Sequence, residues 1–187
     1  MHRTPELKML FRGPFVTYVD YIAFSERLRE AHFTEDKGEK PLTCRWHNGA
    51  LTVDVLALNE EVLGFTNIWY ESALRHAFIV ILPSGQSIRV ITAPFFLGTK
   101  IEAFRGRGKM DFQASHDLED FVAVIEGRDT LLQEIAESPQ ELRRYLAEAA
   151  KMLLAEPRFL DVLPGFVLDN ERVPLIQERL AELVRQG

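Results

Sequence analysis

The segment LTCRWHNGALTVDVLAL, residues 42–58, contains the clearest structural signal in the chain. Asn48-Gly49 separates two apolar-rich runs, residues 42–47 and 50–58. Asn-Gly between such runs is the strongest short-range signal of a β-hairpin. Side chains alternate between the two faces of a strand, so Asp54 interrupts a mostly apolar face of the second run. The segment therefore predicts a hairpin with a carboxylate in mid-strand.

Asp54 has two possible explanations at this stage. A carboxylate flanked by Val53 and Val55 is costly to bury unless it is hydrogen-bonded, paired with a cation or bound to a metal ion. Alternatively its face of the sheet is exposed to solvent, as one face of an antiparallel sheet often is. The residues alone leave both explanations open.

The flanking sequence extends the pattern in both directions. Before the hairpin we expect a strand at 14–19, a helix capped by Asp20 and running to Ala31, and a loop at 34–41. After it we expect a short helix at 67–76 and a second hairpin, with strands Phe78–Leu82 and Ser87–Ile91 joined by the turn 83–86.

The second half of the chain is helical by its capping signals and apolar periodicity. Helices are expected from Thr92-Pro94 to Phe104, from the cap Ser115 to Gly127, for about 15 residues after the capping box SPQE at 138–141, and at 157–163 and 171–185. The fold class is therefore mixed α/β (α+β): a small mixed, largely antiparallel sheet flanked by helices, with a helical C-terminal extension. We expect a sheet region at 1–112 and a helical region at 113–187, packed as one continuous globular unit.

Composition excludes several classes of protein. The 187 residues are 47% hydrophobic and 27% charged, which excludes disordered, collagen-like and disulfide-scaffold chains. No apolar run approaches the roughly 20 residues of a membrane span, and the first residues do not resemble a leader peptide, so we expect a cytoplasmic protein without a membrane partner. The single cysteine, Cys44, excludes an internal disulfide and a cysteine zinc site.

Charge is unevenly distributed along the chain. The net charge is −6, but residues 85–112 carry +3 and residues 113–187 carry −7. The positive block is either a basic groove facing an anionic ligand or a solvated loop. Its cations are Arg89, Lys100, Arg105, Arg107 and Lys109.

The stretch FRGRGKM at 104–110 suits phosphate, because glycine permits close approach of backbone N–H groups and arginine supplies paired donors. It is neither a Walker loop nor a dinucleotide-binding loop. Downstream, Asp117 and Asp120 share a helix face, where they either hold basic residues or transfer protons, or only complement the helix dipole. His116 lacks a second His or Cys at ligand spacing, and Ser115-His116-Asp117 cannot form a triad because adjacent residues do not reach that geometry.

Three segments together resemble a known family: LTVDVLAL at 51–58, LGFTNIWYESAL at 63–74, and the stretch from Ala93 to Arg128 with its K…R…DxxD pattern. Over about residues 25–165 the chain is similar to nucleotidyltransferase-like proteins of the abortive-infection toxin group (AbiEii-type), which share the palm-like fold of DNA polymerase β. That resemblance implies metal-dependent transfer of a nucleotidyl group from a nucleoside triphosphate to an acceptor, with Mg²⁺ as cofactor. It also implies an RNA or protein acceptor and an antitoxin partner.

The resemblance assigns roles to single residues. Asp54 matches the third metal-site carboxylate, and Lys100 matches the lysine at the triphosphate, which makes these two the candidate catalytic residues. Arg105, Arg107 and Lys109 are expected to bind the nucleotide together with that lysine, and Asp117 and Asp120 match the DxxD carboxylates that shape the nucleotide pocket. Such carboxylates hold the metal ions that stabilise the leaving pyrophosphate, while cations neutralise the phosphoryl oxygens.

The chain departs from the family at its start, because residues 1–19 contain neither the glycine-rich turn nor the D-x-D strand. Either the chain is a truncated or degenerate member, or a carboxylate such as Glu6 or Asp20 stands in, or a second chain completes the site. The sequence therefore predicts a nucleotidyltransferase-fold protein whose activity is undecided. The alternatives are a non-catalytic module that binds a nucleotide, RNA or a protein, and a structural remnant.

Overall fold

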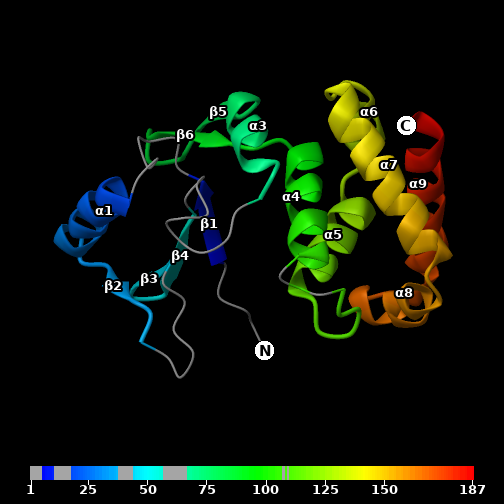
Figure 1. Ribbon diagram of the computed structural model, residues 1–187, viewed down its shortest axis with the longest axis horizontal. Coiled ribbons are helices and arrows are strands. Elements are labelled where there is room, and N and C mark those ends of the chain that lie inside the picture. Colours follow the sequence, from blue (N-terminus) through cyan, green and yellow to red (C-terminus); the bar gives the residue numbers. More distant parts are fainter. Residues whose placement is uncertain (1–5, 11–17, 38–43, 57–66, 107, 109) are drawn as a thin grey trace. The chain divides into compact units, whose positions relative to one another are not determined.

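The computed structural model describes residues 6–10, 18–37, 44–56, 67–106, 108 and 110–187 (Figure 1). The chain divides into two compact units, Met1–Leu74 and Arg75–Gly187. The first unit contains a small sheet with a helix, and the second contains a two-stranded hairpin followed by helices. The predicted α+β class with a helical C-terminal region is confirmed.

The sheet of the first unit has four strands in the order β1-β4-β3-β2. Strand β1 pairs in parallel with β4, whereas the β4–β3 and β3–β2 pairs are antiparallel. The sheet is thus mixed and largely antiparallel, as predicted. The elements of this unit are β1 (Glu6–Leu10), α1 (Tyr18–Glu30), β2 (Thr34–Glu35), β3 (Arg45–Asn48) and β4 (Leu51–Leu56), and α3 (Tyr70–Arg75) ends at its boundary.

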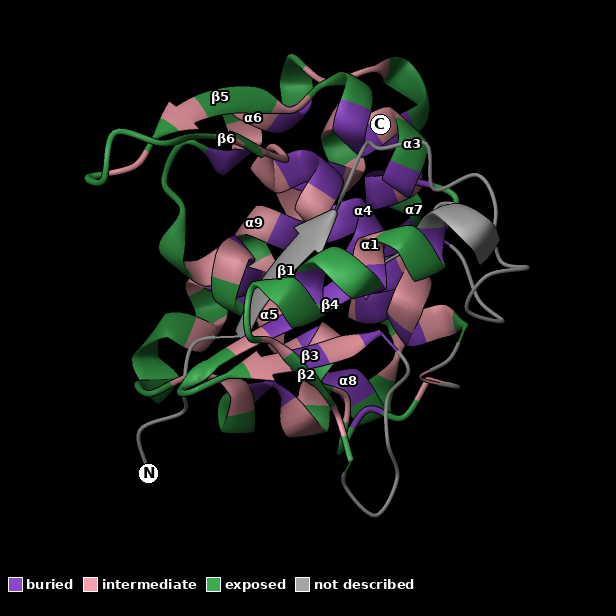
Figure 2. Ribbon diagram, turned by 90° about the vertical axis from the view of Figure 1, so that its left-hand side faces the viewer, coloured by how far each residue is buried: buried purple, intermediate pink, exposed green. Residues whose placement is uncertain are grey.

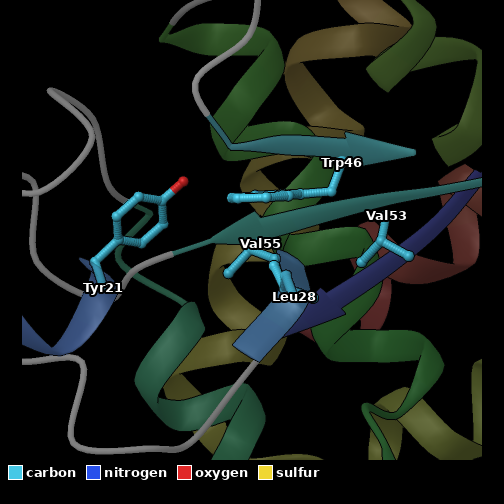
Figure 3. Close-up of a cluster of buried hydrophobic side chains, with 5 residues drawn as sticks. All are labelled: Tyr21, Leu28, Trp46, Val53 and Val55. Carbon is cyan, nitrogen blue, oxygen red and sulfur yellow. The ribbon is translucent and has the colours of Figure 1, made fainter. Parts of the chain in front are cut away.

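One face of this sheet forms the core of the first unit. Trp46 from β3 and Val53 and Val55 from β4 are at most 3% exposed, and Tyr21 and Leu28 of α1 complete the cluster (Figure 3). Alternation along the strands places these apolar residues on a single face. The opposite face therefore carries the residues in between, which include Asp54.

The predicted hairpin at residues 42–58 is confirmed, with its turn one residue later than the motif suggests. Asn48 pairs with Leu51, so the two turn residues are Gly49 and Ala50. Gly49 has φ +57°, a conformation that costs glycine little and most other residues more. This shift determines which residue faces Asp54.

The start of the chain differs from the prediction. Helix α1 begins at Tyr18, so Asp20 lies inside it rather than at its cap, and the last two residues of the expected strand 14–19 are helical. Residues 14–17 lie outside the described residues. Strand β1 was not predicted, although ELKML alternates polar and apolar residues. Strand β2 lies in the expected loop 34–41, of which 38–41 are likewise not described.

The second unit follows the prediction closely in its first part. The hairpin of β5 (Phe78–Ile81) and β6 (Ser87–Val90) is confirmed, and so are α4 (Ala93–Arg105) after Thr92 and α5 (His116–Gly127) after Ser115. The remaining elements are α6 (Leu131–Ala136), α7 (Gln140–Ala155), α8 (Pro157–Val162), the 3₁₀ turns η1 (Leu163–Phe166) and η2 (Asn170–Arg172), and α9 (Val173–Gln186). Helix α6 was not predicted.

The helices of the second unit pack on one another around a shared core. Helix α7 packs against α9, and α4 packs against both α5 and α7. The buried faces of these helices are visible as purple stripes in Figure 2. The expected boundary between the sheet region and the helical region, at residues 112–113, falls between α4 and α5. These two helices pack against each other through buried apolar residues. The division between the units falls at Leu74–Arg75 instead.

The capping box predicted at SPQE does not form. The first residue of α7 is Gln140, and Pro139 occupies the N-cap position. No side chain makes a capping hydrogen bond to the start of this helix. The Ser138 hydroxyl instead donates to the carbonyl of Glu134 over 2.7 Å, because the end of the unpredicted helix α6 comes directly before it.

Candidate functional site

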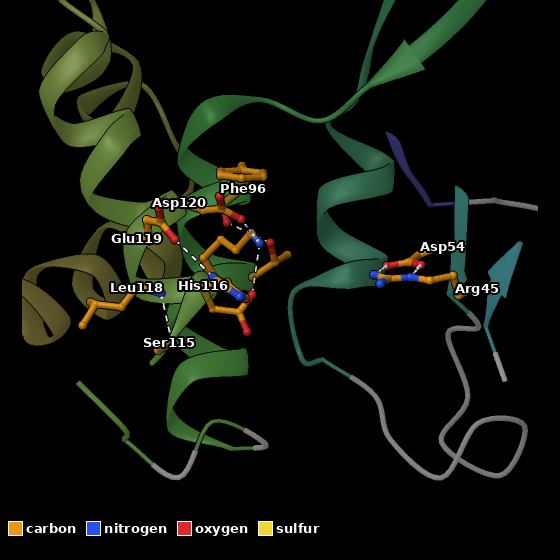
Figure 4. A network of polar contacts seen from close by, with 11 residues as sticks. Arg45, Asp54, Phe96, Ser115, His116, Leu118, Glu119 and Asp120 are labelled. Carbon is orange, nitrogen blue, oxygen red and sulfur yellow. Dashed lines mark hydrogen bonds and ion pairs between the residues drawn. The ribbon is translucent and has the colours of Figure 1, made fainter. Parts of the chain in front are cut away.

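Asp54 is buried and paired with Arg45 in the first unit. Arg45 Nε donates to Asp54 Oδ1 over 2.7 Å and its Nη2 donates to Oδ2 over 2.9 Å (Figure 4). The Asp54 side chain is 9% exposed and that of Arg45 is 22% exposed. The explanation that Asp54 faces solvent is therefore wrong. Of the three ways to bury a carboxylate, pairing with a cation is the one observed.

This pair is a direct consequence of strand register. Arg45 and Asp54 are opposite each other in the antiparallel β3–β4 pair. Arginine suits the position because its planar fork matches both carboxylate oxygens. Sequence reasoning missed Arg45 because a turn centred on Asn48-Gly49 places Thr43 opposite Asp54. Counting the strand pairs outward from a turn at Gly49-Ala50 places Arg45 opposite Asp54.

The next residues along the same face are also polar. His47 is opposite Thr52, and its Nδ1 lies 3.1 Å from Thr52 Oγ1, while its Nε2 lies 3.7 Å from Asp36 Oδ1. In β1 the backbone register pairs Glu6 with Thr52 and Lys8 with Asp54. In the β3–β4 hairpin the face opposite the apolar core is thus polar.

Lys100 is the centre of a second buried cluster, in the second unit. Its Nζ donates to Asp117 Oδ1 over 3.0 Å and to Asp120 Oδ2, and it lies 5.4 Å from the centre of the Phe96 ring. The side chains of Lys100 and Asp117 are 5% and 13% exposed, whereas that of Asp120 is 41% exposed. Figure 4 shows Asp120 and Phe96 next to each other beside this contact. We call Lys100, Asp117 and Asp120 the Lys100 cluster.

Two helix features bring the cluster together. Asp117 and Asp120 are three residues apart on α5 and therefore share a face. The Ser115 hydroxyl accepts a hydrogen bond from Leu118 N over 3.2 Å and so fixes the first turn of that helix. Lys100 projects from the middle of α4, which packs on α5. The predicted shared face is confirmed.

The carboxylates keep Lys100 charged despite its burial. Burial by itself lowers the pKa of the Lys100 ammonium. The hydrogen bond to Asp120 and the negative charge of Asp117 outweigh it, so the pKa of Lys100 lies above its ordinary value. The cluster thus contains one cation and two carboxylates.

The other described cations of the positive block have separate partners. The Arg105 guanidinium lies 5.0 Å from the centre of the Tyr145 ring, and Arg89 donates to the carbonyl of Ala77 over 3.3 Å. Arg107 and Lys109 lie outside the described residues. The expected basic groove stays a prediction.

The glycine loop after α4 is used for a chain reversal. Gly106 N donates to Glu102 O over 2.9 Å and Gly108 N donates to Ala103 O over 3.0 Å. A Cβ at position 108 would lie 2.7 Å from the carbonyl oxygen of Phe104, which only glycine avoids. These N–H groups satisfy carbonyls at the end of α4 and are not directed at a ligand.

The remaining residues around the DxxD motif lie outside the Lys100 cluster. His116 is 72% exposed and its Nδ1 contacts Glu119 Oε2 over 3.1 Å. The Ser115 hydroxyl caps the helix. No group of three or more His, Cys, Asp and Glu side chains suited to a metal ion occurs among the residues that the structure describes.

Comparison with protein-family models, with curated proteins and with solved structures finds no match for this chain. Of the helices described, none has the length and apolar character needed to cross a membrane. The assignment of function therefore depends on the two sites and on the resemblance of the sequence.

Proposed function

We propose that this chain is a nucleotidyltransferase-like protein of the abortive-infection toxin kind that binds a nucleoside triphosphate at the Lys100 cluster. The observation that supports this proposal is the meeting of Lys100 with Asp117 and Asp120, which are 17 and 20 residues away in sequence. These three residues carry most of the resemblance. Their convergence is what a shared pocket requires.

The chemistry of the cluster suits such a ligand. An ammonium group has three donors, and two of them go to Asp117 and Asp120, which leaves one for an anionic oxygen of a phosphate. The partly exposed Asp120 carboxylate accepts hydrogen bonds from ribose hydroxyls or from an amino group of a base. The cluster therefore offers both kinds of contact that a nucleotide makes.

The residues around Asp54 do not fit a magnesium site as they stand. Mg²⁺ takes its ligands from carboxylate oxygens, and both oxygens of Asp54 accept hydrogen bonds from Arg45. The proposal therefore assigns nucleotide binding to the chain and routes no chemical step through a metal ion at Asp54. Binding without turnover is the function that this geometry supports best.

Nucleotidyl transfer to an RNA or protein acceptor is the second candidate. It is favoured by the register of β1, which pairs Glu6 with Thr52, two residues from Asp54, so that a further carboxylate-bearing residue lies in the adjacent strand. A cytoplasmic location and an antitoxin partner belong to the same proposal.

The first experiment is calorimetric titration of the four nucleoside triphosphates into the wild type and into Lys100→Met, with Mg²⁺ in the buffer. We expect at least one triphosphate to bind the wild type, and Lys100→Met to weaken that binding at least tenfold. Lys151→Met removes an exposed lysine from helix α7 and is the matched control. Because Lys100→Met also removes a buried charge, Asp120→Asn, at the exposed side of the cluster, is measured in parallel.

The outcomes separate the functions. Absence of binding by every triphosphate, or equal binding by the wild type, Lys100→Met and Asp120→Asn, overturns the proposed pocket. Binding with release of pyrophosphate and incorporation of labelled nucleotide supports transfer. Binding without incorporation supports a non-catalytic module.

A further inference from the structure

We infer that Arg45 is the built-in cation of Asp54 and takes the place that a divalent metal ion would have at this carboxylate. The inference rests on the proposed function, because only the resemblance assigns a metal to Asp54. Arg45 is the residue that keeps the metal from this carboxylate.

Geometry provides the first argument. The guanidinium of Arg45 contacts both oxygens of Asp54, at 2.7 and 2.9 Å, in the paired arrangement that arginine makes with carboxylates. A metal ion would have to share these oxygens with the guanidinium. The Asp54 side chain is 9% exposed, so little of the carboxylate remains for solvent or for a second cation.

Charge provides the second argument. The Arg45 guanidinium carries a charge opposite to that of Asp54 and lies against it, so the carboxylate attracts a further cation weakly. A divalent ion binds where several oxygen ligands and an excess of negative charge meet. Within the described part of the chain, Asp54 has no cluster of acidic or histidine side chains to supply them.

The strand register provides the third argument. Arg45 lies directly across from Asp54 in the hairpin, and both residues are held by the ladder between β3 and β4. The pair therefore forms whenever the hairpin forms and needs no change elsewhere in the chain. Removing Arg45 is then the change that uncovers both oxygens of Asp54.

The test titrates Mn²⁺ into four proteins and measures the free ion by electron paramagnetic resonance. The proteins are the wild type, Asp54→Asn, Arg45→Gln and the double variant Arg45→Gln/Asp54→Asn. We expect the wild type and Asp54→Asn to bind Mn²⁺ equally. Arg45→Gln should gain weak Mn²⁺ binding that the wild type lacks, because a single carboxylate is uncovered, and the double variant should lose it.

A matched control has the same ion-pair geometry at an exposed position. Arg158 contacts Glu156 through Nε and Nη2, both at 2.8 Å, with its side chain 66% exposed. Arg158→Gln removes a guanidinium from a carboxylate in the same way. We expect it to gain no tight Mn²⁺ site.

Two results overturn the inference. One is weaker Mn²⁺ binding by Asp54→Asn than by the wild type, which shows that Asp54 already binds metal. The other is a folded Arg45→Gln protein that gains no site. Circular dichroism shows whether each variant is folded. If Arg45→Gln does not fold, Mn²⁺ binding is compared between the wild type and Asp54→Asn. Equal binding by these two proteins then supports the inference.

The result is independent of the nucleotide experiment. Failure of all triphosphates to bind overturns the proposed function and leaves the Mn²⁺ comparison valid. A metal site at Asp54 in the wild type overturns the inference and leaves nucleotide binding at the Lys100 cluster untouched.

Discussion

The Arg45–Asp54 pair and the Lys100 cluster are both buried ion pairs, but they differ in balance and in origin. The pair has one charge of each sign and joins residues nine apart in sequence across a hairpin. The cluster has one ammonium between two carboxylates and joins residues 17 and 20 apart on two helices. The carboxylate of the pair is buried, whereas the cluster reaches the surface through Asp120.

This difference indicates where a ligand is expected. A buried carboxylate is not a ligand site when a guanidinium already uses both of its oxygens. A cluster with a partly exposed carboxylate keeps the capacity to accept hydrogen bonds from a ligand. Exposure of a carboxylate therefore distinguishes the two sites.

The largest effect is expected from removing the cation of the cluster. Lys100→Met removes the buried ammonium group that lies between Asp117 and Asp120, so the free energy of unfolding at pH 7 should fall by about 3 kcal/mol. Urea denaturation followed by circular dichroism measures it. The triple variant Lys100→Met/Asp117→Asn/Asp120→Asn should recover more than half of the loss. A loss below about 1 kcal/mol for Lys100→Met would show that solvent screens the cluster.

A smaller effect is expected from the pair. Arg45→Gln leaves the buried Asp54 carboxylate with at most one amide donor, and we expect the free energy of unfolding to fall by about 2 kcal/mol because Arg45 is partly exposed. The double variant Arg45→Gln/Asp54→Asn should recover stability in the same denaturation experiment. If the double variant is less stable than Arg45→Gln, the two residues do not act as a pair.

The smallest effect is expected from pH in the alkaline range. The pKa of Lys100 is raised in the folded chain, so its contribution is complete below the ordinary lysine pKa of about 10.4 and is lost as pH rises through the folded value. Between pH 8 and about 10 the stability difference between the wild type and the triple variant should therefore stay constant, and at higher pH it should shrink. Chemical denaturation at several pH values measures it.

Tyr145 requires a separate control in this experiment. Burial, and then its 2.5 Å hydrogen bond to Glu102, raise the pKa of Tyr145, which also costs stability above pH about 10. Introducing Tyr145→Phe into the wild type and into the triple variant removes the contribution of Tyr145 to the pH dependence of stability. A difference that grows with pH in this background would contradict the assignment to Lys100.

The local features of the fold could be predicted from sequence because their causes lie within a few residues. Asn-Gly predicts the first hairpin, Ser115 predicts the start of α5, and a three-residue spacing places Asp117 and Asp120 on one face. The failures occur where two local signals compete. Ser138 matches a capping box, but the end of α6 takes its hydroxyl.

The candidate sites could be predicted only in part. Sequence identified Asp54, Lys100, Asp117 and Asp120 as residues that need partners. It did not identify Arg45, because a turn displaced by one residue changes which residue lies opposite Asp54. It also suggested that the glycine loop serves phosphate, whereas Gly106 and Gly108 donate to carbonyls of α4.

The sequence by itself determined the hairpins, most of the helices, the α+β class and the residue types available for chemistry, because turn propensity, capping and periodicity act over short stretches of chain. Only the tertiary structure decided which charges meet. Strand register brings Arg45 to Asp54, and packing of α4 on α5 brings Lys100 to two carboxylates. Such pairings depend on how distant segments approach each other, and a short stretch of sequence does not specify that approach.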